Sequence, residues 1–358
     1  MLPTCDVRFG PFDKLRIPTT ALLLAGALLF LTGCPPVHRE VGYTPTEQPM
    51  ERRPPVEKVM PLDPALQEAA RKELADEAKS PEPILRVHAI EEEREVVGVS
   101  ATADYLTALN DGSPVVRYAG AMAVGELRLK VARGTLRGLV DDKNAFVRIA
   151  ARFALHRLGD YTFSHDFETF ARDTDPHIRG MTAMALGRMG ETSATKILMV
   201  LRKDPNPAVR QQASEALWRL GDMVGAEDLA GLIKSHYRDD QMIAILGLAS
   251  THDPNVSQNI RPEITGIDMD VKLVAARGMA MLGGGAYDIG FPIAMDGVRE
   301  TDPKLRVLAA LALGAIGRTD AQPVLRDLLN DKDPDVRIAA AAAILQLTPP
   351  EKRPAGND

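Results

Sequence analysis

The chain has 358 residues, of which 45% are hydrophobic and 4% aromatic, and its formal net charge is −6 at pH 7. This length allows one large domain or two medium-sized ones. Acidic and basic residues are interspersed along the sequence, so the basic patch typical of nucleic-acid-binding proteins is not indicated. Alanine and leucine dominate without runs of alternating β-branched residues, which favours an all-α fold packed through small side chains.

Residues 1–33 have the organisation of an export signal. Three basic residues within positions 1–16 precede the apolar run ALLLAGALLF, and LTGC follows at positions 31–34. A basic start, an apolar core of about ten residues and small residues at its end are typical of a secretory signal peptide. The LTGC segment also resembles the lipoprotein box of bacterial lipoproteins. This resemblance implies cleavage before Cys34 and acylation of that cysteine.

The alternatives for this segment are a signal anchor or an ordinary cleaved signal. The uncharged stretch from Ile17 to Gly33 has 17 residues, the lower limit for crossing a bilayer. The box lies where the apolar run ends, so we prefer lipidation, with Cys5 removed together with the signal. In some bacteria an aspartate after the lipidated cysteine is associated with retention in the inner membrane. Pro35 stands there instead, which favours the outer membrane, facing the periplasm.

Residues 34–64 are expected to form a tether after the lipidated cysteine. Eight of the thirty residues at 35–64 are proline, and no helical period is present. Proline-rich segments act as semi-rigid extended spacers, so this one is expected to hold a folded domain away from the lipid surface. The alternative is that it serves as a proline-rich ligand for another protein.

Residues 65–347 repeat one pattern nine times, which defines the fold. The copies align on one register position, usually arginine, and successive positions are 31 residues apart except for one step of 34. The register positions are Arg86, Arg117, Arg148, Arg179, Arg210, Gln241, Lys272, Arg306 and Arg337.

Each copy has the features of a helix followed by a second, shorter helix. Asp, Asn or Ser followed by Pro, as at Asp333-Pro334, caps a helix start. The residue three positions after the register position is small in every copy, and several copies end at glycine. One hairpin cannot bury both of its faces, so neighbouring hairpins must stack. We expect about eighteen helices in nine pairs, beginning with residues 64–80, and a disordered tail at 348–358.

The pattern DxxPxVRxxAAxALGxLG resembles the short HEAT-like repeat first noted in phycobilisome lyases, over about residues 65–347. The resemblance implies a right-handed α-solenoid of about nine two-helix repeats. Neither the tetratricopeptide pattern nor an ankyrin TPLH motif is present.

In several copies an acid stands six residues before the register arginine. The resemblance implies that these acids and arginines form a ladder of hydrogen bonds between adjacent repeats, and arginine suits this because its planar fork of donors matches a carboxylate. Copies that lack the acid, with Ser235 or Gly266 in its place, also lack the arginine. The alternative, an arginine row that binds a polyanion, is less favoured because the acids would neutralise it. The expected ladder residues are Asp111, Arg117, Asp142, Arg148, Asp173, Arg179, Asp204, Arg210, Arg306, Asp331 and Arg337.

The sequence carries no recognisable catalytic or metal-binding motif. It has seven histidines but no HExxH and no His pair at i, i+4, and it lacks GxSxG and P-loop patterns. Deoxyhypusine hydroxylases are built on HEAT-like repeats and bind iron through His-Glu motifs, yet this chain has no His-Glu dipeptide. We therefore expect no enzyme activity, no cofactor and no metal. A lyase-like or metal-dependent enzyme on this fold is the remote alternative.

The expected function is a non-catalytic scaffold or adaptor, anchored by lipid in the bacterial cell envelope, that binds one or more unidentified proteins and no nucleic acid. The alternative is a binding protein for peptidoglycan or polysaccharide, although sugar sites usually present several aromatic residues and this chain has one Trp and six Tyr. The expected docking region is formed by the irregular repeats, in which Gln241 and Lys272 replace the register arginine. The alternative is that these repeats have only drifted in sequence or mark a bend in the solenoid. The candidate partner-binding residues are His236, Tyr237, Arg238, Gln241 and Lys272.

Overall fold

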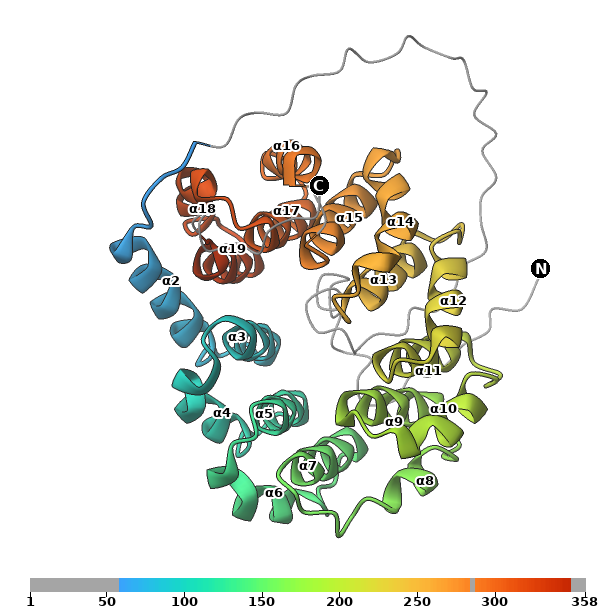
Figure 1. Ribbon diagram of the computed structural model, residues 1–358. Coiled ribbons are helices and arrows are strands. Elements are labelled where there is room, and N and C mark those ends of the chain that lie inside the picture. The colour runs from blue at the N-terminus through green and yellow to red at the C-terminus, as the bar shows by residue number, and fades with distance from the viewer. Residues whose placement is uncertain (1–57, 284–286, 349–358) are drawn as a thin grey trace, which may run out of the picture.

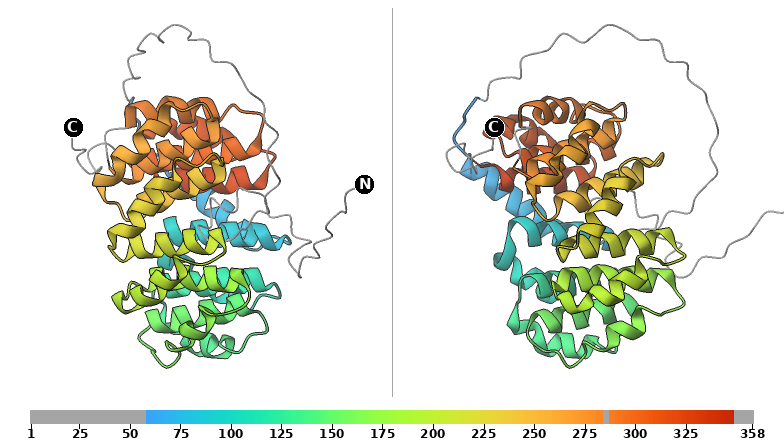
Figure 2. Two further views of the ribbon diagram at one scale, coloured as in Figure 1. Left: turned by 90° about the vertical axis from the view of Figure 1, so that its right-hand side faces the viewer. Right: turned by 45° about the vertical axis from the view of Figure 1, so that its right-hand side comes forward.

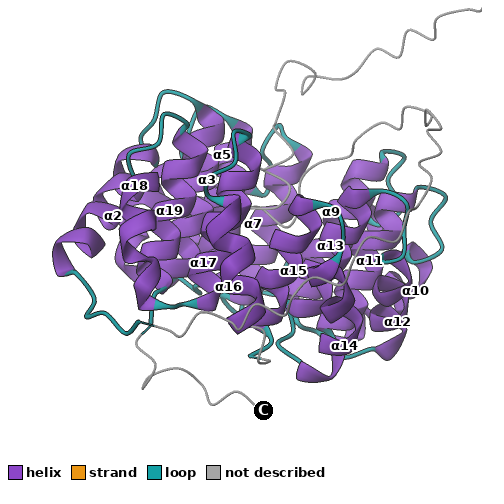
Figure 3. Cartoon of the chain, turned by 90° about the horizontal axis from the view of Figure 1, so that it is seen from above, coloured by secondary structure: helices purple, strands orange, loops and turns teal. Residues whose placement is uncertain are grey.

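A computed structural model describes residues 58–283 and 287–348. Within these residues all regular structure is helical, with 18 α-helices (α2–α19) and six short 3₁₀ helices (η1–η6) (Figure 3). None of the helices in these ranges combines the length and the hydropathy needed to cross a bilayer. The expected export signal, Cys34, most of the tether and the tail from residue 349 lie outside the described residues.

The helices alternate between an inner and an outer set, as the two-helix repeat predicted. The inner helices, which carry the register positions, are α3 (Pro83–Val96), α5 (Pro114–Glu126), α7 (Ala145–Arg157), α9 (Pro176–Met189), α11 (Pro207–Arg219), α13 (Arg238–Ala249), α15 (Met269–Met281), α17 (Pro303–Ile316) and α19 (Pro334–Gln346). The outer helices are α2 (Pro64–Glu77), α4 (Thr102–Ala108), α6 (Arg133–Leu139), α8 (Asp166–Phe170), α10 (Thr195–Leu201), α12 (Met223–Leu232), α14 (Ser257–Ile260), α16 (Tyr287–Gly297) and α18 (Gln322–Leu328). The 3₁₀ helices are η1 (Gly98–Ala101), η2 (Lys130–Ala132), η3 (Thr192–Ala194), η4 (Pro254–Val256), η5 (Arg261–Thr265) and η6 (Thr319–Ala321).

The two ends of the α-solenoid meet and close it into a ring (Figure 1). The inner helix α19 packs against both α2 and α3, and Figure 2 shows the blue α2 beside the red C-terminal helices. Leu66, Ala70 and Leu74 of α2 belong to the same hydrophobic core as the C-terminal repeats. Sequence analysis paired residues 64–80 with the helix that follows them. In the structure α2 occupies the outer position beside α19, so the ninth unit combines the first and last described helices.

Capping side chains set where the inner helices begin. Oδ1 of Asn206 accepts hydrogen bonds from the Ala208 and Val209 N–H groups at 2.9 and 3.4 Å, and Pro207 occupies the first turn, where its missing N–H costs nothing. Asp333 caps α19 in the same way. Ser113, which precedes Pro114 and so fits the Ser-Pro capping pattern, makes no side-chain bond to its helix; its own N–H donates to Asp111 Oδ1 at 2.7 Å.

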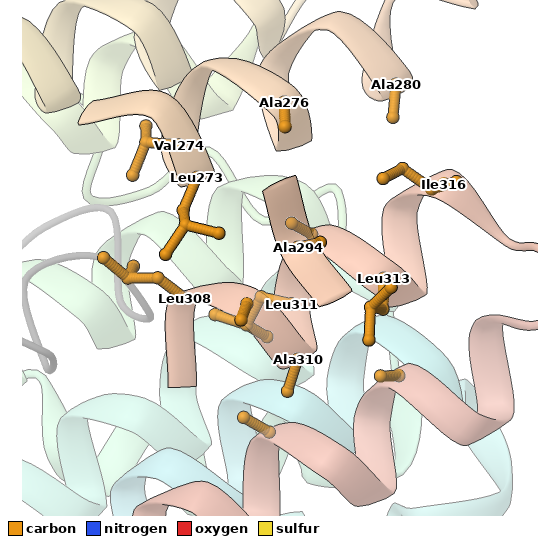
Figure 4. Packing of buried hydrophobic residues seen from close by; sticks show 14 of the residues in the cluster. Leu273, Val274, Ala276, Ala280, Ala294, Leu308, Ala310, Leu311, Leu313 and Ile316 are labelled. Atoms are coloured by element: carbon orange, nitrogen blue, oxygen red, sulfur yellow. The ribbon is translucent and has the colours of Figure 1, made fainter. Parts of the chain in front are cut away.

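Small side chains allow the helices to approach closely, as the small position after the register residue predicted. Seven alanines and Thr182 at this position are all 0% exposed. The one remaining copy has Gly120 at this position, where an added Cβ would lie 2.7 Å from Cβ of Ala108 on α4. Figure 4 shows small side chains between helices farther along the ring, where Ala276 of α15, Ala294 of α16 and Leu311 of α17 belong to one hydrophobic core. Close approach lets short outer helices cover the inner ones.

Candidate functional site

The register arginines and the acids join neighbouring repeats at one edge of the ring, where outer helices lead into inner ones. Arg117 donates through Nε and Nη2 to the two carboxylate oxygens of Asp142, in the following repeat, at 2.9 and 3.0 Å. Its Nη1 donates to the carbonyls of Asp111 and Gly112, in its own loop, at 2.9 and 3.2 Å. Each such arginine therefore bonds the carboxylate of the next repeat and the backbone of its own. The pairs with this geometry are Arg86–Asp111, Arg117–Asp142, Arg179–Asp204 and Arg306–Asp331.

The carboxylates are fixed from both sides, which ties the loop to the preceding helix. Asp204 accepts from Arg179 at 2.7 and 2.8 Å and from the Asn206 N–H at 2.9 Å. The Arg179 hydrogen bonds outweigh burial and lower the pKa of Asp204 below its ordinary value. The arginines of these pairs are thus held by carboxylates within the framework, which leaves little of their charge for a separate ligand.

Among the described residues, the expected side-chain pair is missing for three predicted ladder residues, which are Arg148, Asp173 and Arg210. Arg148 donates to the carbonyls of Asp142 and Lys143 at 2.9 and 3.1 Å, and within the described ranges it makes no ion pair with Asp173. Arg210 likewise donates only to the carbonyls of Asp204 and Pro205, because Ser235 replaces the acid in the next repeat.

The ladder closes around the ring through acids that sequence analysis did not identify. Arg337 of α19 donates through Nε to Glu73 at 2.7 Å and through Nη2 to Glu77 at 2.6 Å, both on α2. Next to this contact, His88 Nδ1 of α3 lies 2.6 Å from Asp335 Oδ1 of α19. The signal in the sequence is the pair of glutamates one helical turn apart, which lies outside the repeat pattern.

The residues expected to bind a partner are brought together only in part. His236, Tyr237 and Arg238 are exposed at the start of α13, and Arg238 lies 3.3 Å from Asp270 of the next repeat. Gln241 belongs to the ladder row, where its Nε2 donates to the Ser235 carbonyl at 2.9 Å as an arginine would. Lys272 holds the corresponding position one repeat later and is half-buried. An exposed patch thus exists at residues 236–238, and the other two residues are part of the framework.

At the opposite edge of the ring, the described chain begins as an extended segment fixed to the C-terminal repeat. The N–H groups of Lys58, Met60 and Asp63 donate to side chains of Asp320, Thr319 and Gln322 at 3.1, 3.0 and 2.8 Å. Gln322 also donates to the Pro61 carbonyl at 2.9 Å, and Arg326 donates to Asp63 at 2.6 Å. The segment therefore has a defined place along η6 and α18.

This edge, which we call the tether edge, also carries exposed apolar side chains in the connections from inner to outer helices. They are Val99, Val131, Tyr161 and Met223, each at least 60% exposed, with Val59 in the tether segment. Scattered exposed apolar residues are normal on soluble proteins, so these side chains do not by themselves define a site.

A cluster of arginines lies on the inner side of the ring near the tether edge, and sequence analysis did not identify it. Arg94, Arg157, Arg188 and Arg219 occupy the last turns of α3, α7, α9 and α11. Glu126, at the end of α5, accepts hydrogen bonds from both Arg94 and Arg188. Because α7 stands between α5 and α9, these side chains meet on the concave side of the ring. Here we use the term inner arginine cluster for these four arginines and Glu126.

The charges of the inner arginine cluster are unevenly balanced. Burial opposes ionisation of Glu126, but Arg188 and Arg94 outweigh it and lower the pKa of the carboxyl group. Arg219 pairs with Glu215 of its own helix at 3.0 Å. Burial and the nearby Arg128 both lower the pKa of Arg157, and within the described part of the chain its guanidinium donates only to the Met189 carbonyl, at 3.4 Å. Glu126 and Glu191 oppose this shift from a distance, so Arg157 is the arginine of the cluster with the weakest direct hydrogen bonding among the described residues.

The match to a family model supports the helical-repeat fold. Residues 167–249 and 292–355 match the family described as HEAT repeats. Similar solved structures include the complex of CpcE and CpcF of phycocyanin lyase from Nostoc sp. PCC7120, with 20% identity, a TM-score of 0.42, and 70% of this chain and 98% of that chain covered. Human deoxyhypusine hydroxylase in complex with glycerol is also similar, with 17% identity, a TM-score of 0.34, and coverage of 80% and 99%. No curated protein sequence matches the chain.

The repeat pattern, the two-helix units and the matched residues identify the chain as a HEAT-like repeat protein. Low identity and low TM-scores mean that the two solved structures carry no conclusion about function. Within residues 58–283 and 287–348, no three His, Cys, Asp or Glu side chains gather as metal ligands.

Proposed function

We propose that this protein is a non-catalytic adaptor of the bacterial cell envelope, anchored by a lipid on Cys34, that binds a protein partner through the HEAT-like ring. The observation that carries the proposal is the fixed tether segment. Residues 58–63 leave the predicted anchor region and are hydrogen-bonded to η6 and α18. A segment fixed in this way makes the chain join the ring at the tether edge, which we expect to face the membrane.

The edge opposite the tether then points away from the membrane, and its most exposed apolar side chains belong to neighbouring connections. Ile267 is 97% exposed and Tyr237 63% exposed. They lie beside the Arg238–Asp268 contact of 3.7 Å, which joins the two connections. Aromatic and aliphatic side chains flanked by charges are typical of the centre and rim of protein interfaces. This patch supports the expected docking region at residues 236–238.

The anchor is tested with Cys34→Ala in the producing bacterium. We expect the wild-type protein to fractionate with membranes and to incorporate a labelled fatty acid, and the variant to lose both, since two or more acyl chains are needed for stable anchoring. Membrane fractionation and labelling of Cys34→Ala equal to the wild type would contradict the lipid anchor.

The adaptor role is tested by cross-linking and co-purification of the native protein from its membrane. The double variant Tyr237→Ser/Ile267→Ser is expected to recover much less partner than the wild type. Val99→Ser/Val131→Ser, which removes two exposed apolar side chains at the tether edge, serves as the control. Pelleting of the purified protein with cell-wall material, without a protein partner, would favour peptidoglycan or polysaccharide instead.

A further inference from the structure

The inner arginine cluster has hydrogen-bond donors that its own residues do not satisfy. Arg94 and Arg188 share the carboxylate of Glu126. Glu95, Glu191 and Glu215 add negative charge near Arg94, Arg157 and Arg188, respectively. The Nε atoms of these three arginines are buried without a hydrogen-bond partner among the described residues. Buried polar groups in proteins are nearly always hydrogen-bonded, and each exception requires an explanation. An additional anionic acceptor at the cluster would supply the missing partners.

The cluster differs from the arginine ladder in the way its charges are used. In the ladder, Arg179 and Asp204 match one guanidinium to one carboxylate through two parallel hydrogen bonds. In the cluster, Arg94 and Arg188 share the two oxygens of Glu126, and Arg157 has only a long contact to a carbonyl. Structural stabilisation accounts for the first arrangement but leaves the second with Nε donors that have no acceptor among the described residues.

Glu126 indicates the kind of group that this cluster accepts. Its carboxylate is held between guanidinium groups from two helices that are not neighbours, α3 and α9. Arginine binds planar carboxylates with particular specificity because its donors form a rigid fork. A second carboxylate next to Glu126 would meet the same donors, with Arg157 as its main counter-ion.

The spacing of the arginines favours a chain of carboxylates over a single small acid. Arg157 and Arg188 come from adjacent inner helices, and packed helices lie roughly 8–10 Å apart. In an extended peptide, residues two or three positions apart are separated by about 7–10 Å. Acidic residues at such intervals therefore reach successive guanidinium groups along the inner face.

We propose that the inner arginine cluster binds an acidic peptide segment of a protein partner, with Arg157 as the principal contact and Glu126 as an internal competitor for the same arginines. The identity of the occupant as part of a protein rests on the proposed adaptor function. The site itself is separate from the exposed patch at residues 236–238, which lies at the other edge of the ring.

The test uses the purified full-length chain in detergent and a fluorescein-labelled hexaglutamate peptide, with binding measured by fluorescence anisotropy. Hexalysine carrying the same dye is the control peptide. Arg157→Gln is expected to weaken hexaglutamate binding about tenfold, corresponding to loss of one charged contact. Arg172→Gln, which removes an exposed arginine away from the cluster, is expected to leave binding unchanged. Added salt is expected to weaken binding because the attraction is between charges.

Glu126→Gln supplies a readout that a purely structural cluster would not give. The amide keeps an acceptor for Arg94 or Arg188 but removes the competing charge, so hexaglutamate is expected to bind several-fold more tightly than to the wild type. Circular dichroism and thermal melting establish that each variant is folded.

Three results would overturn the proposal. The first is no hexaglutamate binding by the folded wild type, and the second is equal binding by Arg157→Gln. The third is Arg157-dependent binding of inorganic phosphate, or of phosphatidylglycerol vesicles, in place of the peptide, which would assign the cluster to phosphate groups. If the first result is found while the Tyr237-dependent partner still co-purifies, the peptide site fails and the adaptor function stands.

Discussion

Nε of Arg337 in α19 lies 2.7 Å from Oε1 of Glu73 in α2, so the last described helix is hydrogen-bonded directly to the first. We expect Arg337→Ala to lower the free energy of unfolding by about 1.5–3 kcal/mol, the range for hydrogen bonds to charged groups. Because the contact closes the ring, hydrogen exchange should accelerate most in α2 and α19.

The matched control for ring closure is Arg179→Ala, which removes a ladder contact inside the array. Its exchange should accelerate around α9 and the loop at Asp204, with α2 unchanged. Equal protection of α2 in wild type and Arg337→Ala, measured by hydrogen exchange with mass spectrometry, would argue that apolar contacts alone close the ring.

The ladder arginines are expected to differ in their contribution to stability. Arg179 bonds both oxygens of Asp204 and two loop carbonyls, whereas the acceptors of Arg210 among the described residues are loop carbonyls alone. Arg179→Ala should therefore cost about 1–2 kcal/mol more than Arg210→Ala, since it also leaves a nearly buried carboxylate without its partner. Urea unfolding of the two variants measures the difference. A larger loss for Arg210→Ala would mean that the side-chain pair adds nothing to the carbonyl contacts.

The repeat pattern was sufficient to predict the helices and their alternation, and it failed only for the pairing of the first helix. Asn206-Pro207 and Asp333-Pro334 mark helix starts through local hydrogen bonds and the restricted φ of proline, and both depend on a few consecutive residues. The small residue after each register position predicted close helix packing for a similarly local reason. These features require no knowledge of how distant parts of the chain meet.

Ring closure and the inner arginine cluster depend on long-range geometry instead. Closure results from small rotations summed over all units, and Glu73 belongs to a helix outside the register pattern. In sequence, Arg94 and Arg188 read as ordinary basic residues near helix C-termini, where they are favoured anyway. Only the curvature of the ring brings Arg188 to Glu126, 62 residues away.

Close packing between neighbouring inner helices is expected to make Gly187 sensitive to a single methyl group. An added Cβ would lie 2.6 Å from both Cα and Cβ of Ala216 on α11. Because Cα cannot move without the helix, Gly187→Ala should destabilise the protein by about 1–3 kcal/mol. Gly138→Ala, in α6 with nothing within 4 Å of the new methyl group, should instead stabilise it by up to about 1 kcal/mol. Thermal melting of the pair checks both signs, and a stable Gly187→Ala would show that α9 and α11 separate easily.

A buried glutamate is expected to make the stability depend on pH in the opposite direction from the ladder aspartates. Burial raises the pKa of Glu93, which is 2% exposed, from 4.5 to about 8. Between these values the unfolded chain releases a proton that the folded chain keeps, so the contribution of Glu93 to stability is complete below pH 4.5 and declines as the pH rises to about 8.

Glu93→Met removes this ionisation while keeping a side chain of similar length. Relative to the wild type, the variant should gain stability as the pH is raised from 4.5 to 8, by at most about 1.4 kcal/mol for each pH unit. Urea unfolding at half-unit steps of pH measures the difference. Glu95→Met, on the same helix with a side chain 59% exposed, is the matched control. A constant difference between Glu93→Met and wild type across this window would show that Glu93 ionises in the folded protein, with water or a cation reaching its carboxyl group.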